Sequence, residues 1–131
     1  MNLLDENVPL DQRDLLRAWG IPCRVIGQDI ARLSIADDNI LVLLHRLKQP
    51  TLFTRDEDFF ARPLCHPAYG LVWLDVAPEE AALFTRRVLR HPRFATKAAR
   101  LGVVIRASHD HLQFWQWHHT ALQRATWSDH G

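Results

Sequence analysis

Acidic side chains recur in three short segments of the N-terminal half of the chain. They are Asp5, Glu6, Asp37, Asp56 and Asp58. Each lies just after a predicted strand or in the first turn of a predicted helix, and open parallel sheets bind ligands at the carboxyl ends of their strands. Carboxylates that converge there repel one another until a cation neutralises them. Oxygen ligands select Mg²⁺ or Mn²⁺ over zinc, and such ions can activate water against a phosphodiester.

The same acids also fit ordinary structural roles. Aspartate is frequent in turns and at the start of helices. Asp37 follows Ser34 at the spacing of a capping box, so it can complete a helix cap. Asp56 and Asp58 can cap a helical turn that contains Phe59. Composition alone therefore leaves a metal site and a set of local caps as alternatives.

Alternating strands and helices must position these acids. The predicted strands span residues 2–4, 22–26, 51–54, 69–76, 101–107 and 111–117. The predicted helices run from Pro9 to Trp19, from Ser34 to about Lys48 and from Pro78 to about Leu89. This alternation predicts an α/β fold with a mainly parallel sheet flanked by helices. Residues 108–110 join the last two strands as a predicted C-terminal hairpin.

The composition is that of one globular domain over residues 1–131. Hydrophobic residues make up 47% of the chain, which excludes a disordered protein, and the apolar runs are too short to cross a membrane. Two distant cysteines exclude a disulfide framework and a zinc ribbon. The start of the chain has no signal-peptide pattern, so we expect a cytoplasmic protein. The polar residues 124–131 are expected to form a frayed tail.

Three segments carry a resemblance to a known family. They are Leu3-Leu4-Asp5-Glu6-Asn7, Asp37-Asp38-Asn39-Ile40-Leu41 and Leu52-Phe53-Thr54-Arg55-Asp56-Glu57-Asp58-Phe59. On these motifs residues 2–60 resemble the PIN-like superfamily, and in particular the small PIN-like proteins that open with LLDEN and carry TRDxDF. Those proteins are related to the VapC-type toxins of bacterial toxin–antitoxin pairs.

The resemblance implies a doubly wound sheet and an endoribonuclease that depends on Mg²⁺ or Mn²⁺. The implied catalytic and metal-binding acids are Asp5, Asp37, Asp56 and Asp58. RNA is the implied substrate, and a small antitoxin protein is the implied partner. The chain departs from the family pattern in two ways. The further acid expected between the first two motifs has only Asp14 and Asp29 as candidates, and Asp38 competes with Asp37 for the motif position.

Residues beside these acids are candidates for holding them in place or for contacting substrate. They are Glu6, Asn7, Asp38, Thr54 and Arg55. Asn7 and Thr54 can orient the carboxylates by hydrogen bonds, or they can form local turn hydrogen bonds. Arg55 can clamp a phosphate oxygen. A surface salt bridge to a neighbouring acid is the commoner role for such an arginine.

Basic and aromatic residues dominate the C-terminal half of the chain. The candidate RNA-binding residues are Arg86, Arg90, Arg93 and Lys97, with Tyr69, Phe94, Trp115 and Trp117 as candidate stacking faces. Cations would hold the phosphates while aromatic faces stack on the bases. The alternatives are a solvated helix face for the cations, and core packing or a homodimer interface for the tryptophans. His109 and His111 lack a third ligand, which disfavours a zinc site.

The leading hypothesis is a metal-dependent endoribonuclease, the toxin of a toxin–antitoxin pair, that hydrolyses RNA with metal-activated water. The alternative is a catalytically silent PIN-like module that binds RNA or a protein. A receiver-like domain is disfavoured because Lys48 and Lys97 lie in predicted helices. A Toprim-like domain would use Glu6 as its catalytic acid, and the LLDEN context of Glu6 argues against it.

Overall fold

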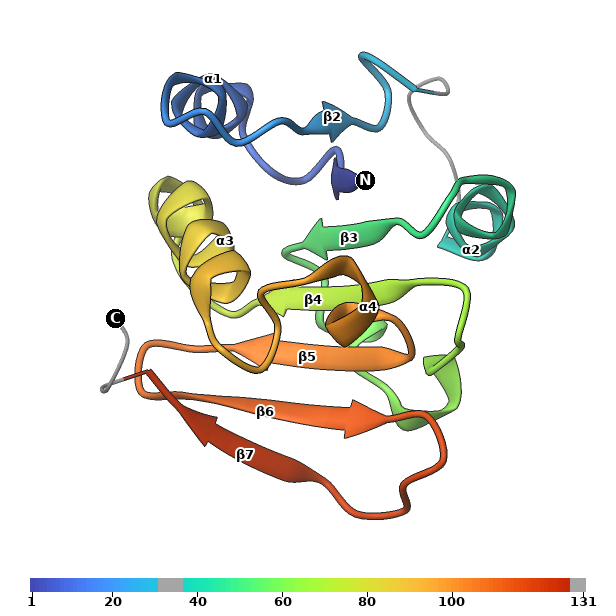
Figure 1. The fold of residues 1–131 in the computed structure, drawn as a ribbon. Helices are drawn as coiled ribbons and strands as arrows, with labels where there is room; N and C mark the ends of the chain where they lie inside the picture. The colour runs from blue at the N-terminus through green and yellow to red at the C-terminus, as the bar shows by residue number, and fades with distance from the viewer. Residues whose placement is uncertain (31–36, 128–131) are drawn as a thin grey trace.

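The computed structural model describes residues 1–30 and 37–127, except for the side chains of residues 37–39. Its described part contains a seven-stranded sheet with the order β2-β1-β3-β4-β5-β6-β7 (Figure 1). The strands are β1 Asn2–Leu4, β2 Arg24–Val25, β3 Thr51–Thr54, β4 Gly70–Leu74, β5 Val103–Ala107, β6 His111–Gln116 and β7 Gln123–Thr126. Strands β1 to β5 pair in parallel, and β6 and β7 pair antiparallel. The predicted α/β class with a mainly parallel sheet is confirmed.

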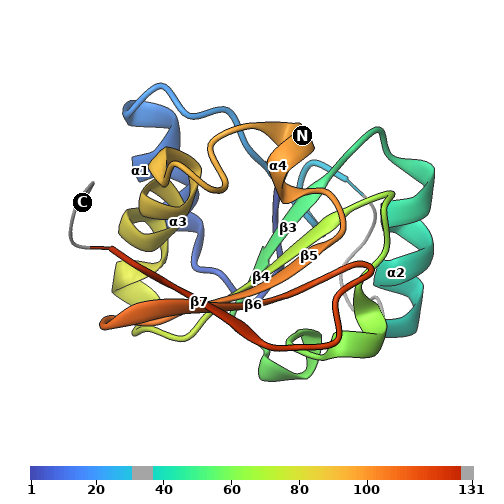
Figure 2. The ribbon, with the colours of Figure 1, turned by 60° about the horizontal axis from the view of Figure 1, so that its bottom comes forward.

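Helices cover both faces of this sheet. They are α1 Leu10–Ala18, α2 Asp37–Arg46, α3 Ala81–Arg90 and the short α4 Lys97–Arg100, with 3₁₀ turns η1 Glu57–Phe59, η2 Arg62–Leu64 and η3 Pro78–Glu80. Helices α1 and α3 lie together on one face, and α2 lies on the other (Figure 2). Helix α1 ends where Gly20 adopts a φ of +78°, a left-handed conformation that glycine reaches without strain.

The central strands are apolar on both sides because both faces are packed. Leu4, Phe53 and Val72 belong to the core beneath α1 and α3. Their neighbours along the strands point the opposite way, and Leu3 and Leu52 belong to the core beneath α2. Side chains alternate between the faces of a strand, so a strand covered on both faces becomes a continuous apolar run.

The C-terminal part confirms one prediction and contradicts another. Strands β5 and β6 form the predicted hairpin. The predicted frayed tail is wrong for residues 124–127, because β7 pairs with β6 and adds the last strand of the sheet. Trp127 is 4% exposed, and its Nε1–H donates to the carbonyl oxygen of Ser108 at 2.7 Å. The alternating apolar pattern that normally signals a strand is absent from the sequence QRAT.

Two other predictions concern the helices. The predicted capping box of Ser34 and Asp37 lies outside the residues whose side chains the structure describes. Within the described residues, no helix has the length and apolar character needed to span a bilayer.

Candidate functional site

The carboxyl ends of β1 and β3 lie side by side where the strand order reverses. The chain leaves β1 for β2 on one side and returns through α2 to β3 on the other side. Such a reversal leaves a crevice outside the strand ends, which is where open α/β sheets bind ligands. The N–H of Asp5 donates to the carbonyl oxygen of Phe53 at 2.9 Å, so the pairing extends one residue past β1. The LLDEN and TRDxDF segments therefore meet at this edge.

Asp5 is a buried carboxylate at this edge, with only 4% of the residue exposed. Its Oδ1 accepts a hydrogen bond from the backbone N–H of Glu6 at 2.8 Å. Its Oδ2 accepts one from the hydroxyl of Thr54 at 2.8 Å. The two bonds fix the carboxylate plane from both strand ends, because Glu6 follows β1 and Thr54 is the last residue of β3.

Thr54 and Asn7 connect the two motifs further. The Thr54 hydroxyl accepts the side-chain amide N–H of Asn7 at 3.1 Å and the backbone N–H of Asp56 at 3.0 Å. The Asn7 amide nitrogen also lies 3.5 Å from Oδ2 of Asp5, and its Oδ1 accepts the N–H of Arg55 at 3.1 Å. Each hydrogen-bonding group of the Asn7 side chain thus contacts the TRDxDF segment. The structure brings Asn7 and Thr54 onto Asp5, and Thr54 is fully buried.

The side chains of Asp56 and Asp58 differ in exposure and in hydrogen bonding. Asp56 is half-buried and caps η1, since its Oδ1 accepts the N–H of Asp58 at 2.9 Å. The second carboxylate oxygen of Asp56 accepts no hydrogen bond from any described residue. Asp58 is exposed, and Phe59 beside it is buried. The alternative that Asp56 caps a helical turn is confirmed, and this role still leaves one of its oxygens available.

The remaining predicted acid opens α2. That helix links β2 to β3 and begins at Asp37, so its first turn lies toward the carboxyl edge. The side chains of Asp37 and Asp38 lie outside the described residues. Among the side chains that the structure does describe, no three Asp, Glu, His or Cys residues gather closely enough to hold an ion. In this structure the exposed Asp58 does not lie in such a group with Asp5 and Asp56.

The groups at this edge fit a hard cation by their chemistry. The described candidate ligands are the carboxylates of Asp5 and Asp56, whereas the Thr54 hydroxyl and the Asn7 amide are already used in hydrogen bonds within the network. Both carboxylates offer oxygen. Mg²⁺ commonly takes one or two protein carboxylates and completes its shell with water and substrate phosphate.

The two acids between the first motifs have local partners. Asp14 pairs with Arg13 at 3.0 Å on the surface of α1. Asp29 Oδ2 accepts the backbone N–H of Val25 at 2.9 Å and a guanidinium N–H of Arg17 at 3.1 Å. The Val25 hydrogen bond first, and the Arg17 charge after it, lower the pKa of the Asp29 carboxyl. Both acids are thus used within the fold of the N-terminal segment.

Arg55 has the clearest unmet hydrogen bond at this edge. Its Nε is buried and has no hydrogen-bond partner among the described residues. The salt bridge that the sequence favoured for Arg55 is absent from the described part of the chain. Glu6 beside Asp5 is exposed.

The predicted RNA-binding cations lie elsewhere. Helix α3 follows β4 and runs back toward the amino ends of the strands, so Arg90 lies at the end of α3 that points away from Asp5. Lys97 lines a cavity with Met1 and Asn2, at the opposite end of β1 from Asp5. The structure therefore does not bring Arg90 and Lys97 to the acidic edge.

The other basic residues and the aromatic candidates are largely used in packing. Arg86 stacks on the ring of Trp19 at 3.8 Å, and the exposed Arg93 lies over the ring of Phe114 at 4.8 Å. The prediction that Tyr69 and Phe94 offer stacking faces is wrong, because they are 4% and 1% exposed. Trp115 is half-buried against the α2-side core, and Trp117 is 44% exposed.

Comparisons with protein-family models, with curated proteins and with solved structures found no match to this chain. The resemblance to the PIN-like superfamily therefore rests on the motif residues. Residues of two of the three motif segments, 3–7 and 52–59, are far apart in the sequence and form one hydrogen-bonded group in the fold.

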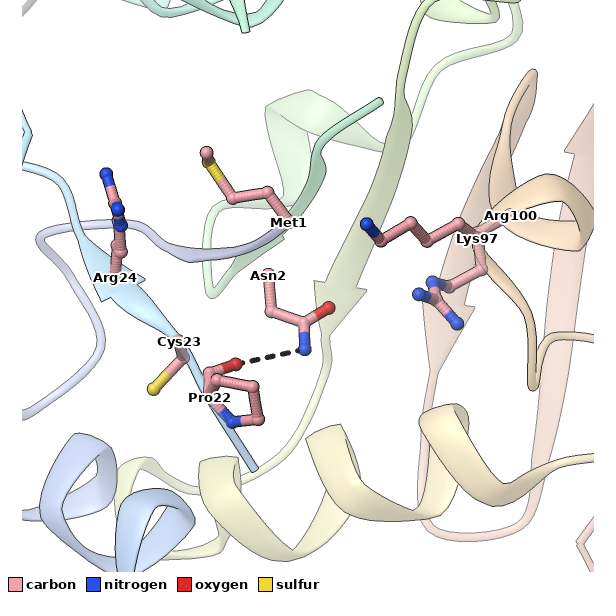
Figure 3. Close-up of a pocket in the computed structure, with 7 residues that line it drawn as sticks. All are labelled: Met1, Asn2, Pro22, Cys23, Arg24, Lys97 and Arg100. Atoms are coloured by element: carbon pink, nitrogen blue, oxygen red, sulfur yellow. Dashed lines mark hydrogen bonds between the residues drawn. The ribbon is translucent and has the colours of Figure 1, made fainter. Parts of the chain in front are cut away.

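Sequence reasoning missed a second polar site, at the amino ends of the strands. There the segment 22–24 faces Lys97 and Arg100 across the start of β1 (Figure 3). No local motif joins these residues, which are more than 70 positions apart in the sequence. The signal that was available is the set of three cations, Arg93, Lys97 and Arg100, in a segment without an acid, residues 93–103.

Proposed function

We propose that the chain is a metal-dependent endoribonuclease of the PIN-like type, with its centre at the carboxyl ends of β1 and β3. The observation that supports this most is the network around Asp5, in which Thr54 and Asn7 hold one buried carboxylate. Buried carboxylates are costly, and proteins keep them where they are paired or bind a cation. A purely local cap is usually more open to solvent, as the 33% exposed side chain of Asp29 illustrates.

Asp5 and Asp56 would hold Mg²⁺ or Mn²⁺. Asp37 or Asp38, from the first turn of α2, would supply a third carboxylate. When bound, the ion would supply charge neutralisation and an activated water for hydrolysis of the phosphodiester. Thr54 and Asn7 would keep Asp5 in one orientation, since both donate to its Oδ2. Arg55, which has no ion-pair partner among the described residues, would contact a phosphate oxygen through its guanidinium. Control by a small antitoxin is part of the same proposal.

The test is Mn²⁺ binding by calorimetry on the whole chain near neutral pH. We expect the wild-type chain to bind, and Asp5→Asn and Asp56→Asn each to weaken binding about ten-fold or more, because each loses a charged ligand. The matched control is Asp14→Asn, which makes the same change at an exposed residue of α1. Circular dichroism and urea unfolding would show that each variant is folded.

The outcomes separate an enzyme from the silent module. Binding that is lost in both site variants and kept in the control supports a metal centre, and cleavage of a mixed RNA pool with Mn²⁺ is the next assay. No binding by the wild-type chain at millimolar Mn²⁺ would refute the metal centre. In that case the catalytically silent PIN-like module becomes the better hypothesis. Equal losses of Mn²⁺ affinity in all three variants would also refute the metal centre, because the weaker binding would then result from the change in overall charge.

A further inference from the structure

A cavity of about 290 Å³ lies at the edge of the sheet opposite to Asp5. Its walls are the start of β1, the segment 22–24 that leads into β2, and helix α4 (Figure 3). Asn2 holds two of these walls together, since its side-chain amide donates to the carbonyl oxygen of Pro22 at 3.1 Å. This volume is near the lower limit for small-molecule sites, so it fits a small ligand or one end of a larger one.

Arg100 carries a buried positive charge into this cavity. The residue is 5% exposed, and burial lowers the pKa of its guanidinium, which nevertheless stays protonated. Its Nε donates to the hydroxyl of Thr51 at 3.0 Å, and its Nη1 donates to the carbonyl oxygen of Phe94 at 2.7 Å. Both acceptors are neutral. No described carboxylate forms an ion pair with Arg100, which is unusual because buried charges are normally paired.

The fold holds Arg100 in this position through a close approach to β4. A Cβ added to Gly70 would collide with the backbone carbonyl oxygen of Arg100. Gly102, just after α4, donates its N–H to the carbonyl oxygen of Tyr69 at 2.9 Å, so α4 is attached at the start of β4. The buried guanidinium is therefore placed by backbone packing as well as by its own hydrogen bonds.

Lys97 adds a second cation from the same helix. In Figure 3 its ammonium group extends from α4 toward Met1, whereas Arg24 on the opposite wall extends away from it. Lys97 is exposed and has no ion-pair partner among the described residues. Burial, together with the charges of Lys97 and Arg100, lowers the pKa of the Met1 amino group. None of the described residues that line the cavity is acidic, so these like charges repel one another.

We propose that this cavity is a binding site for a phosphate group, held by Lys97 and Arg100. A dianion would neutralise two cations that the described residues leave unpaired, whereas a single carboxylate would neutralise only one. Arginine and lysine are the side chains that proteins use most for phosphate. The group is either the phosphate of a small phosphorylated molecule or the 5′-phosphate of an RNA. This site lies at the other edge of the sheet and does not depend on the proposed nuclease centre.

The test is calorimetric titration of the whole chain with inorganic phosphate, a nucleoside 5′-monophosphate and a short RNA with and without its 5′-phosphate. Acetate at the same ionic strength is the comparison ligand. We expect phosphate to bind, and Lys97→Gln to weaken its binding about ten-fold, as for the loss of one charged hydrogen bond. The control is Arg124→Gln, an equal loss of charge at an exposed residue of β7, at the far side of the sheet.

Each outcome decides the proposal. Phosphate binding that Lys97→Gln weakens and Arg124→Gln leaves unchanged supports the site. If the RNA that carries a 5′-phosphate binds more tightly than the nucleoside monophosphate, the site is assigned to RNA ends. If that RNA binds equally or more weakly than the nucleoside monophosphate, the site is assigned to a small ligand. Three results would overturn the proposal. They are no binding at ten millimolar phosphate, equal binding of acetate, and equal weakening by both variants.

Discussion

Replacing Thr54 with valine tests whether the hydrogen-bond network at the strand ends stabilises the fold. Valine keeps the shape of threonine and removes a hydroxyl that makes three hydrogen bonds, to Asp5, Asn7 and Asp56. The bond to the Asp5 carboxylate is worth about 1.5–3 kcal/mol, because its acceptor is charged. The N–H groups of Asn7 and Asp56 lose an acceptor but are only partly buried, so water can replace part of that contact. The expected loss of unfolding free energy is therefore about 2–4 kcal/mol.

The chain provides a matched control in Thr85. Thr85 is 1% exposed, and its hydroxyl has no hydrogen-bond partner in the part of the chain that the structure describes. Thr85→Val should therefore be neutral or stabilise the fold by about 1 kcal/mol. Urea unfolding would measure both variants, and a loss of about 3 kcal/mol moves the midpoint by roughly 1–3 M. Equal stability of the two variants would refute the reasoning, because the network would then contribute nothing beyond the shape of the side chain.

Three further predictions test other parts of the fold. Gly70→Ala should destabilise it by about 1–3 kcal/mol in urea unfolding, since the new methyl meets the Arg100 carbonyl oxygen. Trp127→Ala should cost about 3–5 kcal/mol, whereas a frayed tail would show no effect. The pKa of Asp29 is lowered in the folded state, so its contribution is present above the unfolded pKa of about 3.9. The stability difference between wild type and Asp29→Asn should therefore begin to shrink as the pH falls below about 4, and it should be lost as the pH falls through the lower pKa of folded-state Asp29.

The position of the acidic edge could be predicted because it depends on chain order and periodicity. Asn2–Leu4 and Thr51–Thr54 are short apolar runs followed at once by polar residues, and each became a strand that ends where predicted. Once both strands are parallel, their carboxyl ends must share an edge, so Asp5 and Asp56 follow neighbouring strands. The separate contribution of Thr54 was harder to foresee. Its hydroxyl links Asp5 with Asn7 and Asp56 only after the register of β1 and β3 is set.

Other features depend on tertiary contacts that the sequence does not display. Strand β7 has no apolar alternation, and it forms because β6 offers an unpaired edge and Trp127 fills the core beside α3. The arginines of residues 86–100 form one charge run in the sequence, which left an RNA-binding surface and a solvated helix face as alternatives. In the fold Arg86 stacks on Trp19 of the α1 end and Arg100 is buried over β3. A charge run in the sequence therefore gives the number of cations in a segment. Which of these cations can bind a ligand depends on the residues that each one contacts in the fold.

The two proposed sites lie at opposite edges of the sheet and have opposite charge for a topological reason. Parallel strands place every strand-to-helix turn at the carboxyl edge and every helix-to-strand turn at the amino edge. Acids favour the first kind of turn because they cap the helix that follows, and cations favour the second because they lie at helix C-termini. Asp56, which caps η1, and Arg100 in the last turn of α4 follow this rule. The rule does not require that such charges be buried. Among the described residues, Asp5 and Arg100 are nevertheless buried, and we propose the metal and phosphate sites around them.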